Sequence, residues 1–181
     1  MKSLRCMLSV VLLSLSTVVF AQSDAQEPVA QSDAQKSFAK LKTLAGSWEG
    51  QLTTAPQDPD VEGKLMQVSL RATSMGNALM HEMMVAGRPD DPITMLYLDA
   101  DRLLLTHYCD AGNRPRMVGK MSPDGKTVEF DFVDISGGTQ RGHMHHAVFT
   151  VIDANHHTED WTYMMPGDKP MHAHFDLHRK N

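Results

Sequence analysis

Short runs of alternating apolar and polar residues follow one another along most of this chain. In residues 127–132 and 171–178 every second side chain is apolar, so each run has one apolar and one polar face, as a half-buried strand does. Gly, Pro, Asn and Asp separate the runs, for instance in the turn-forming sequence at residues 122–125. The pattern predicts ten strands, over residues 47–53, 64–74, 78–85, 93–99, 103–110, 116–121, 127–133, 143–152, 157–164 and 171–179.

Ten strands joined by hairpin-sized turns predict an all-β fold, an antiparallel up-and-down meander. An open meander would leave two exposed edges, and closure into a barrel removes them. A ten-strand barrel is wider than the eight-strand kind whose interior is filled by side chains or one small ligand, so we expect an internal pocket. One short helix precedes the strands, because Phe38, Leu41, Leu44 and Ala45 recur at helical spacing over residues 37–45 and Gly46 follows.

The segment from Ser37 to Gly50 and the segment from Leu103 to Met117 carry a resemblance to known proteins. A short helix followed by Gly46-Ser47-Trp48 resembles the first strand of calycins, the superfamily of lipocalins, fatty-acid-binding proteins and nitrobindin-like proteins. Residues 103–117 are similar to bacterial exported lipocalin-like families of unassigned function. Over residues 37–180 the resemblance implies a calycin-like β-barrel of about ten strands with a short N-terminal helix.

The N-terminus has the pattern of a signal peptide. Lys2 and Arg5 precede an apolar run, and Val19 and Ala21 fit the −3 and −1 positions of a cleavage site. The run is too short to span a bilayer, so we expect cleavage after residue 21, no transmembrane segment afterwards, and export to the periplasm or beyond. The repeated Ala-Gln-Ser-Asp-Ala-Gln sequence predicts a disordered linker over residues 22–36, before a barrel domain at 37–181.

The charge and cysteine content of the chain limit the classes of function it can have. The chain has 181 residues, 17 basic and 22 acidic, for a net charge of −5. Removal of Lys2 and Arg5 with the signal leaves 15 basic against 22 acidic residues, a net charge of −7 that argues against nucleic-acid binding. Cys109 would then be the single cysteine, so no internal disulfide is expected. Nothing in the sequence fixes the oligomeric state.

The candidate ligand-binding residues lie at several positions of the predicted barrel. His107 and Cys109 share a strand face with Leu103 and Leu105, so we expect them inside the barrel. Their i, i+2 spacing is too wide for a catalytic Cys–His pair, and no other catalytic set is present. The predicted site is completed by Tyr97, Arg116 and Trp48.

Tyr97 and Arg116 are included in the predicted site by analogy with fatty-acid-binding proteins, which hold a ligand carboxylate with an interior arginine and tyrosine. The alternative is that Arg116 is a surface arginine in a hairpin. Trp48 has two interpretations, a plug for the closed end of the barrel or a surface on which a ligand stacks.

Ten histidines suggest metal binding, yet their positions argue against a predicted metal site. His143/His145 and His172/His174 each offer only two imidazoles, where zinc takes three or four protein ligands, and the two pairs are expected on opposite faces of the sheet. We therefore expect no cofactor and a small, mainly apolar or amphipathic ligand held without catalysis. The alternative is a haem- or metal-binding barrel that uses His107 or the histidine-rich C-terminal strands. The last-strand histidines lie on the polar face and Gly50-Gln-Leu-Thr-Thr lacks the glycine run of nitrobindins, which weakens the case for haem.

Overall fold

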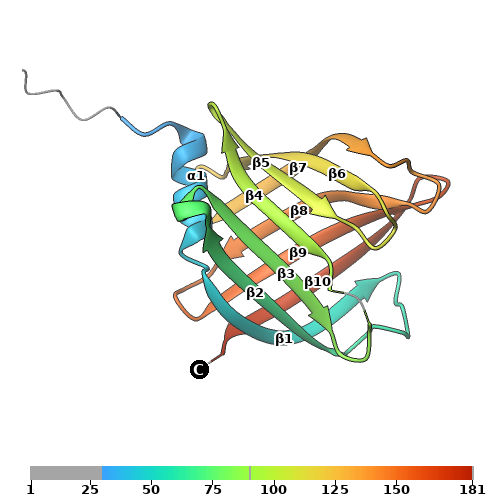
Figure 1. Cartoon of the computed structure of the whole chain (residues 1–181). Coiled ribbons are helices and arrows are strands. Elements are labelled where there is room, and N and C mark those ends of the chain that lie inside the picture. Colours follow the sequence, from blue (N-terminus) through green and yellow to red (C-terminus); the bar gives the residue numbers. More distant parts are fainter. Residues whose placement is uncertain (1–29, 90, 181) are drawn as a thin grey trace, which may run out of the picture. The chain divides into compact units, whose positions relative to one another are not determined.

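The alternation of apolar residues along the chain is realised as a closed antiparallel barrel of ten strands (Figure 1). The computed structural model describes residues 30–89 and 91–180. The predicted signal peptide and most of the predicted linker lie outside the described residues. No helix in the described part of the chain is long and apolar enough to cross a membrane.

Each strand pairs with its neighbours in sequence, and β1 also pairs with β10, which closes the sheet. The all-β prediction of about ten strands with one short helix is therefore confirmed. The strands are β1 (Gly46–Ala55), β2 (Leu65–Thr73), β3 (Ala78–Val85), β4 (Ile93–Asp99), β5 (Arg102–Tyr108), β6 (Arg114–Met121), β7 (Thr127–Ser136), β8 (His143–Val151), β9 (His156–Met165) and β10 (Lys169–Arg179), with a single 3-10 turn, η1 (Ser74–Gly76).

The helix α1 (Asp33–Lys42) begins and ends earlier than the residues 37–45 expected from apolar spacing. Ser32 caps it: its hydroxyl accepts a hydrogen bond from the Gln35 backbone amide, and the Gln35 side chain accepts one from the Ser32 amide. Both residues belong to the polar repeat, so the repeat that predicted a disordered linker also supplies a helix start. Residues 33–36, which the prediction placed in the linker, are helical.

Trp48 and Arg179 close the end of the barrel next to α1. The indole N–H of Trp48, which is 1% exposed, donates to the Leu44 carbonyl at 2.8 Å. The Arg179 guanidinium lies 4.1 Å above the indole ring and donates to the carbonyls of Thr43 and Ala45. The first strand, the last strand and the end of the helix are therefore held together around one tryptophan.

A β-bulge in β8 changes which side chains face inward. Met144 pairs with Tyr163, and the next paired residues are His146 with Thr162 and Ala147 with Trp161. Because Tyr163 and Trp161 share a face of β9, Met144 shares the inward face with Ala147. His143 precedes Met144 and therefore lies on the opposite face from Ala147, although strict alternation along the strand would place the two residues on one face.

Candidate ligand-binding cavity

An apolar cavity of about 320 Å³ opens at the end of the barrel opposite α1. Its walls come from inward-facing positions at the ends of β1, β3, β5 and β9 and at the starts of β2, β8 and β10, together with three connecting loops. Four methionines, whose unbranched thioethers adapt to irregular shapes, contribute to this lining. The apolar lining residues are Leu52, Val61, Met66, Met83, Val85, Pro92, Met144, Trp161, Met171, Ala173 and Phe175, and the polar or aromatic ones are Thr54, Asp58, Arg88, His107, Cys109, Asp110 and Tyr163.

The polar side chains of the lining gather near its mouth. Arg88, in the loop after β3, pairs with Asp110, after β5, at 3.1 Å. The loop after β1 is fixed by Glu62, whose carboxylate accepts hydrogen bonds from the amide and hydroxyl of Thr54 at 2.7 and 2.8 Å. The mouth thus combines a cation and carboxylates above an apolar interior.

His107 is the polar residue that lies deepest in the lining. Its side chain is buried, with the residue 1% exposed, and Nδ1 lies 2.8 Å from the Thr94 hydroxyl. The ring of Trp161 lies 5.8 Å away, centroid to centroid. Burial, reinforced by the nearby His81, lowers the pKa of His107 from 6.5 to about 3. The imidazole is therefore neutral at physiological pH and able to accept or donate a hydrogen bond.

A buried carboxylate, Glu159, lies in the barrel interior among three N–H donors. Nε2 of His81 lies 2.9 and 3.1 Å from its two oxygens, Nε2 of His157 lies at 3.1 Å, and the indole N–H of Trp161 donates at 2.9 Å. Burial acts to raise the pKa of Glu159, but the attraction of His81 and the hydrogen bonds from His157 and His81 outweigh it, so the net pKa lies below the ordinary value. Glu159 is thus a buried anion.

This cluster joins β3 to β9 across the barrel and contacts the cavity through Trp161. Trp161 lines the cavity and donates to Glu159, and its ring also lies 5.7 Å from that of His81. Among residues 30–89 and 91–180, no group forms a hydrogen bond with the buried Nδ1 atoms of His81 and His157. The cluster therefore orients the tryptophan that forms part of the cavity wall.

Sequence reasoning missed this cluster. The sequence carries only a partial signal: Glu159 lies between His157 and Trp161 on one face of β9, but the residues on the other face are polar as well. His81 likewise alternates with the buried Leu79 and Met83 on β3. A charged residue on an inward face implies a buried partner.

Of the five residues predicted to bind a ligand, two line the cavity. His107 and Cys109 do, whereas Trp48 lies at the closed end and Tyr97 and Arg116 lie on the outer surface. Tyr97 alternates with inward-facing neighbours on β4, and its hydroxyl lies 3.1 Å from that of Thr106, on the next strand.

Arg116 is held on the outer surface by a carboxylate of β7. Its guanidinium binds both carboxylate oxygens of Asp134, from Nε at 2.7 Å and from Nη2. This pairing raises the pKa of Arg116 and lowers that of Asp134. Tyr97 and Arg116 therefore do not occupy interior positions like those of the arginine and tyrosine in fatty-acid-binding proteins.

Cys109 lies half-buried at the mouth, just after β5. Its thiol is 3.4 Å from Oδ1 of Asp110. Burial, with the neighbouring Asp110 charge, raises the pKa of the thiol to about 11, against a smaller opposing hydrogen bond from Ala111. Cys109 is therefore a protonated thiol at neutral pH, the form that is the poorer nucleophile.

Comparison with known proteins reveals similarity of fold. No protein-family model and no curated protein sequence matches the chain. The crystal structure of Rv2717c from M. tuberculosis matches with a TM-score of 0.58 and 17% identity, over 80% of this chain and 98% of that one. A protein of unknown function from the DUF3598 family of Nostoc punctiforme matches with a TM-score of 0.55 and 10% identity, over 77% of this chain and 48% of that one. At these identities the two matches show similarity of fold alone.

Proposed function

We propose that this protein is an exported, non-enzymatic binding protein that holds a small, mainly apolar ligand in the barrel. The observation that carries the proposal is the open cavity of about 320 Å³ with its apolar, methionine-rich wall. Sites for small molecules are typically concave and apolar, with a few polar groups that fix orientation. A ligand that buries roughly 200 Å² of apolar surface there would gain about 5 kcal/mol from desolvation.

The polar groups of the lining define the chemistry of the ligand. Arg88 and Asp110 at the mouth can bind a polar or charged end of the ligand, while His107 offers one neutral hydrogen-bonding group in the interior. An amphipathic molecule with its apolar part inward fits this distribution. The high pKa of Cys109 supports binding over thiol catalysis.

Native mass spectrometry tests the proposal on the purified protein, before and after incubation with a lipid extract. Ala173 lines the cavity and faces inward, so Ala173→Trp should fill it and abolish the bound species. His174→Trp places the same bulk on the exposed face of β10 and is the matched control. A wild-type protein that never retains a ligand, or an Ala173→Trp variant that retains it as well as His174→Trp, would overturn the proposal.

Haem is the second candidate ligand, and the observation that favours it concerns His107. Its low pKa keeps the imidazole neutral, as metal ligation requires, and Thr94 engages Nδ1, which leaves Nε2 as the nitrogen for an iron. Haem titration should then give a Soret band that His107→Ala removes. An unchanged absorbance spectrum in the wild-type titration would exclude this candidate.

Export is proposed from the N-terminal sequence alone. Expression of the full-length chain in a bacterium, with separation of periplasm from cytoplasm, should give a processed protein that begins near Gln22. Intact-mass measurement identifies the first residue. Recovery of an unprocessed chain from the cytoplasm alone would refute export without affecting the ligand-binding proposal.

A further inference from the structure

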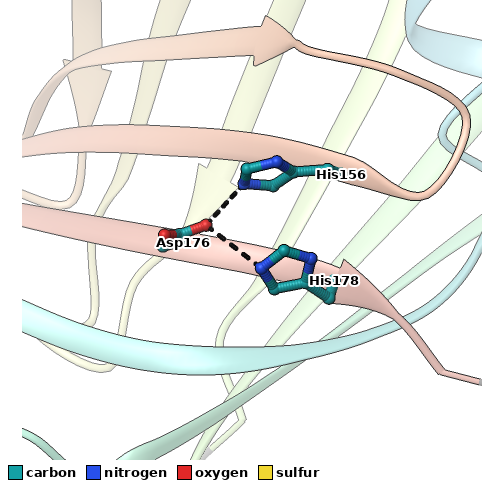
Figure 2. A group of neighbouring side chains, drawn as sticks. All are labelled: His156, Asp176 and His178. Carbon is teal, nitrogen blue, oxygen red and sulfur yellow. Dashed lines mark hydrogen bonds and ion pairs between the residues drawn. The ribbon is translucent and has the colours of Figure 1, made fainter.

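We propose that His156, Asp176 and His178 form a binding site for one divalent transition-metal ion such as Zn²⁺. The three side chains lie together on the outer face of β9 and β10 (Figure 2). This site is separate from the cavity, because the neighbouring residues His157 and Phe175 face the barrel interior. The proposal therefore stands or falls independently of the proposed ligand.

Strand pairing, rather than spacing in the sequence, brings the three ligands together. His178 is directly opposite His156 in the antiparallel register of β9 and β10, and Asp176 precedes His178 by two residues on the same face. The imidazole rings of His156 and His178 stack with centroids 4.3 Å apart. The side chains thus converge on one point above the sheet (Figure 2).

The distances between the ligand atoms are close to those around a bound zinc ion. Oδ1 of Asp176 lies 2.7 Å from Nε2 of His156 and 3.7 Å from Nε2 of His178, and all three ligand atoms lie within 4.8 Å of one another. Ligands about 2.0–2.1 Å from a tetrahedral ion are about 3.3 Å apart. The separations of 2.7 and 3.7 Å lie on either side of this spacing, so small side-chain rotations bring the set to that geometry.

The donor set selects the kind of metal. Two imidazoles and one carboxylate suit Zn²⁺, Ni²⁺ or Cu²⁺, whereas Ca²⁺ and Mg²⁺ take mostly oxygen ligands. The other cluster of this kind among the described residues, Glu129, Asp131 and His146, has a single imidazole and is a weaker candidate for zinc.

The ligands are accessible to solvent, with the side chains of Asp176 and His178 55% and 64% exposed. Water can therefore complete the coordination. On β1, Glu49 is opposite His178 and pairs with Lys180 at 3.3 Å, so it adds a further carboxylate to the surroundings of the site.

The test measures zinc binding by competition with a chromophoric chelator, on the whole purified protein after removal of bound metal and of any affinity tag. We expect one zinc ion per chain. His178→Gln removes one ligand from an exposed position, where the cost to folding is small. It should weaken binding at least tenfold.

His174→Gln is the matched control, because His174 lies on the same exposed face of the same strand and pairs only with Asp160 among the described residues. It should bind zinc as the wild type does. Urea unfolding curves of both variants confirm that each is folded. Absence of stoichiometric zinc binding, or equal binding by His178→Gln and the wild type, would overturn the proposal.

Discussion

Substitution of His107 by asparagine should flatten the dependence of folding stability on pH below neutrality. The pKa of His107 is 6.5 in an ordinary environment and about 3 in the folded barrel. Between these values the unfolded chain binds a proton at this imidazole that the folded chain does not. Stability therefore falls as pH falls, because protons favour the unfolded chain.

The magnitude follows from the difference in proton binding. Each pH unit between about 6.5 and 3 changes the free energy of unfolding by up to about 1.4 kcal/mol per proton. From pH 7.5 to pH 4.5, His107 alone should therefore remove about 3 kcal/mol of stability. His107 is almost fully buried, so solvent screening reduces this figure little.

Asparagine is the suitable replacement because its side-chain oxygen occupies nearly the position of Nδ1. It can keep the hydrogen bond from the Thr94 hydroxyl, so the change removes the titrating group and preserves the local contact. The smaller side chain should cost about 1–2 kcal/mol at pH 7.5 through lost packing. This loss shifts the whole stability curve, whereas the lost titration changes its slope.

Urea unfolding at pH 7.5, 6.5, 5.5 and 4.5 measures the slope through the fluorescence of Trp48 and Trp161, which are both buried in the barrel. His172→Asn is the control, since His172 makes the same Nδ1 contact with a threonine hydroxyl, 3.1 Å from Thr162, on the exposed face. It should keep the wild-type slope. If His107→Asn loses as much stability between pH 7.5 and 4.5 as the wild type, a neutral buried His107 is refuted.

Three further predictions concern other parts of the barrel. Glu159→Gln turns an amide N–H toward one of the donors around the carboxylate, so it should lower the free energy of unfolding by about 3 kcal/mol and the melting temperature by about 6–12 °C. Calorimetry measures the melting temperature, and a decrease no larger than that of the exposed Asp160→Asn variant would contradict the prediction. Gly50→Ala would place a methyl group 1.7 Å from the Asp176 carbonyl oxygen, so β1 and β10 must separate and stability should fall by about 3 kcal/mol or more; an unchanged urea midpoint would contradict the register. Alkylation of Cys109 by iodoacetamide, followed by mass spectrometry, should accelerate about tenfold per pH unit from pH 7 to 10, because the pKa of the thiol is about 11; a plateau near pH 9 would show a more acidic thiol.

The fold could be predicted because its cause is local. Alternation of apolar residues assigns each strand an inner and an outer face, and turn residues mark where strands end, so both the number and the order of the strands follow. The expected strand over residues 171–179 is observed as Lys169–Arg179, with Phe175 and Leu177 inside. The start of α1 was harder to predict, since it depends on the capping pair Ser32 and Gln35 rather than on apolar spacing.

The sites depend on contacts that the sequence does not encode locally. His81 and Glu159 meet only because the sheet closes into a barrel, and His156 meets His178 only because β9 and β10 pair in one register. Along residues 156–160 both faces of the strand carry polar side chains, so alternation alone does not mark Glu159 as buried. The geometry of neighbouring strands supplies this information.

The outward positions of Tyr97 and Arg116 show why the analogy with fatty-acid-binding proteins failed: it matched residue types without checking which face of the strand they lie on. Leu96 and Leu98 pack toward the core on either side of Tyr97, and Pro115 and Met117 are buried on either side of Arg116. The period-2 rule therefore points both polar side chains outward. Applied strictly to β4 and β6, that rule would have corrected the expectation from sequence alone.

Closure of the barrel by β10 also determines when, during folding, the cavity becomes complete. Three cavity-lining residues, Met171, Ala173 and Phe175, belong to this last strand. Until β10 has paired, the cavity lacks a wall, and β1 and β9 each present an unpaired strand edge that invites aggregation. Any ligand of this cavity therefore binds only chains in which β10 has already paired, and it cannot guide the earlier steps of folding.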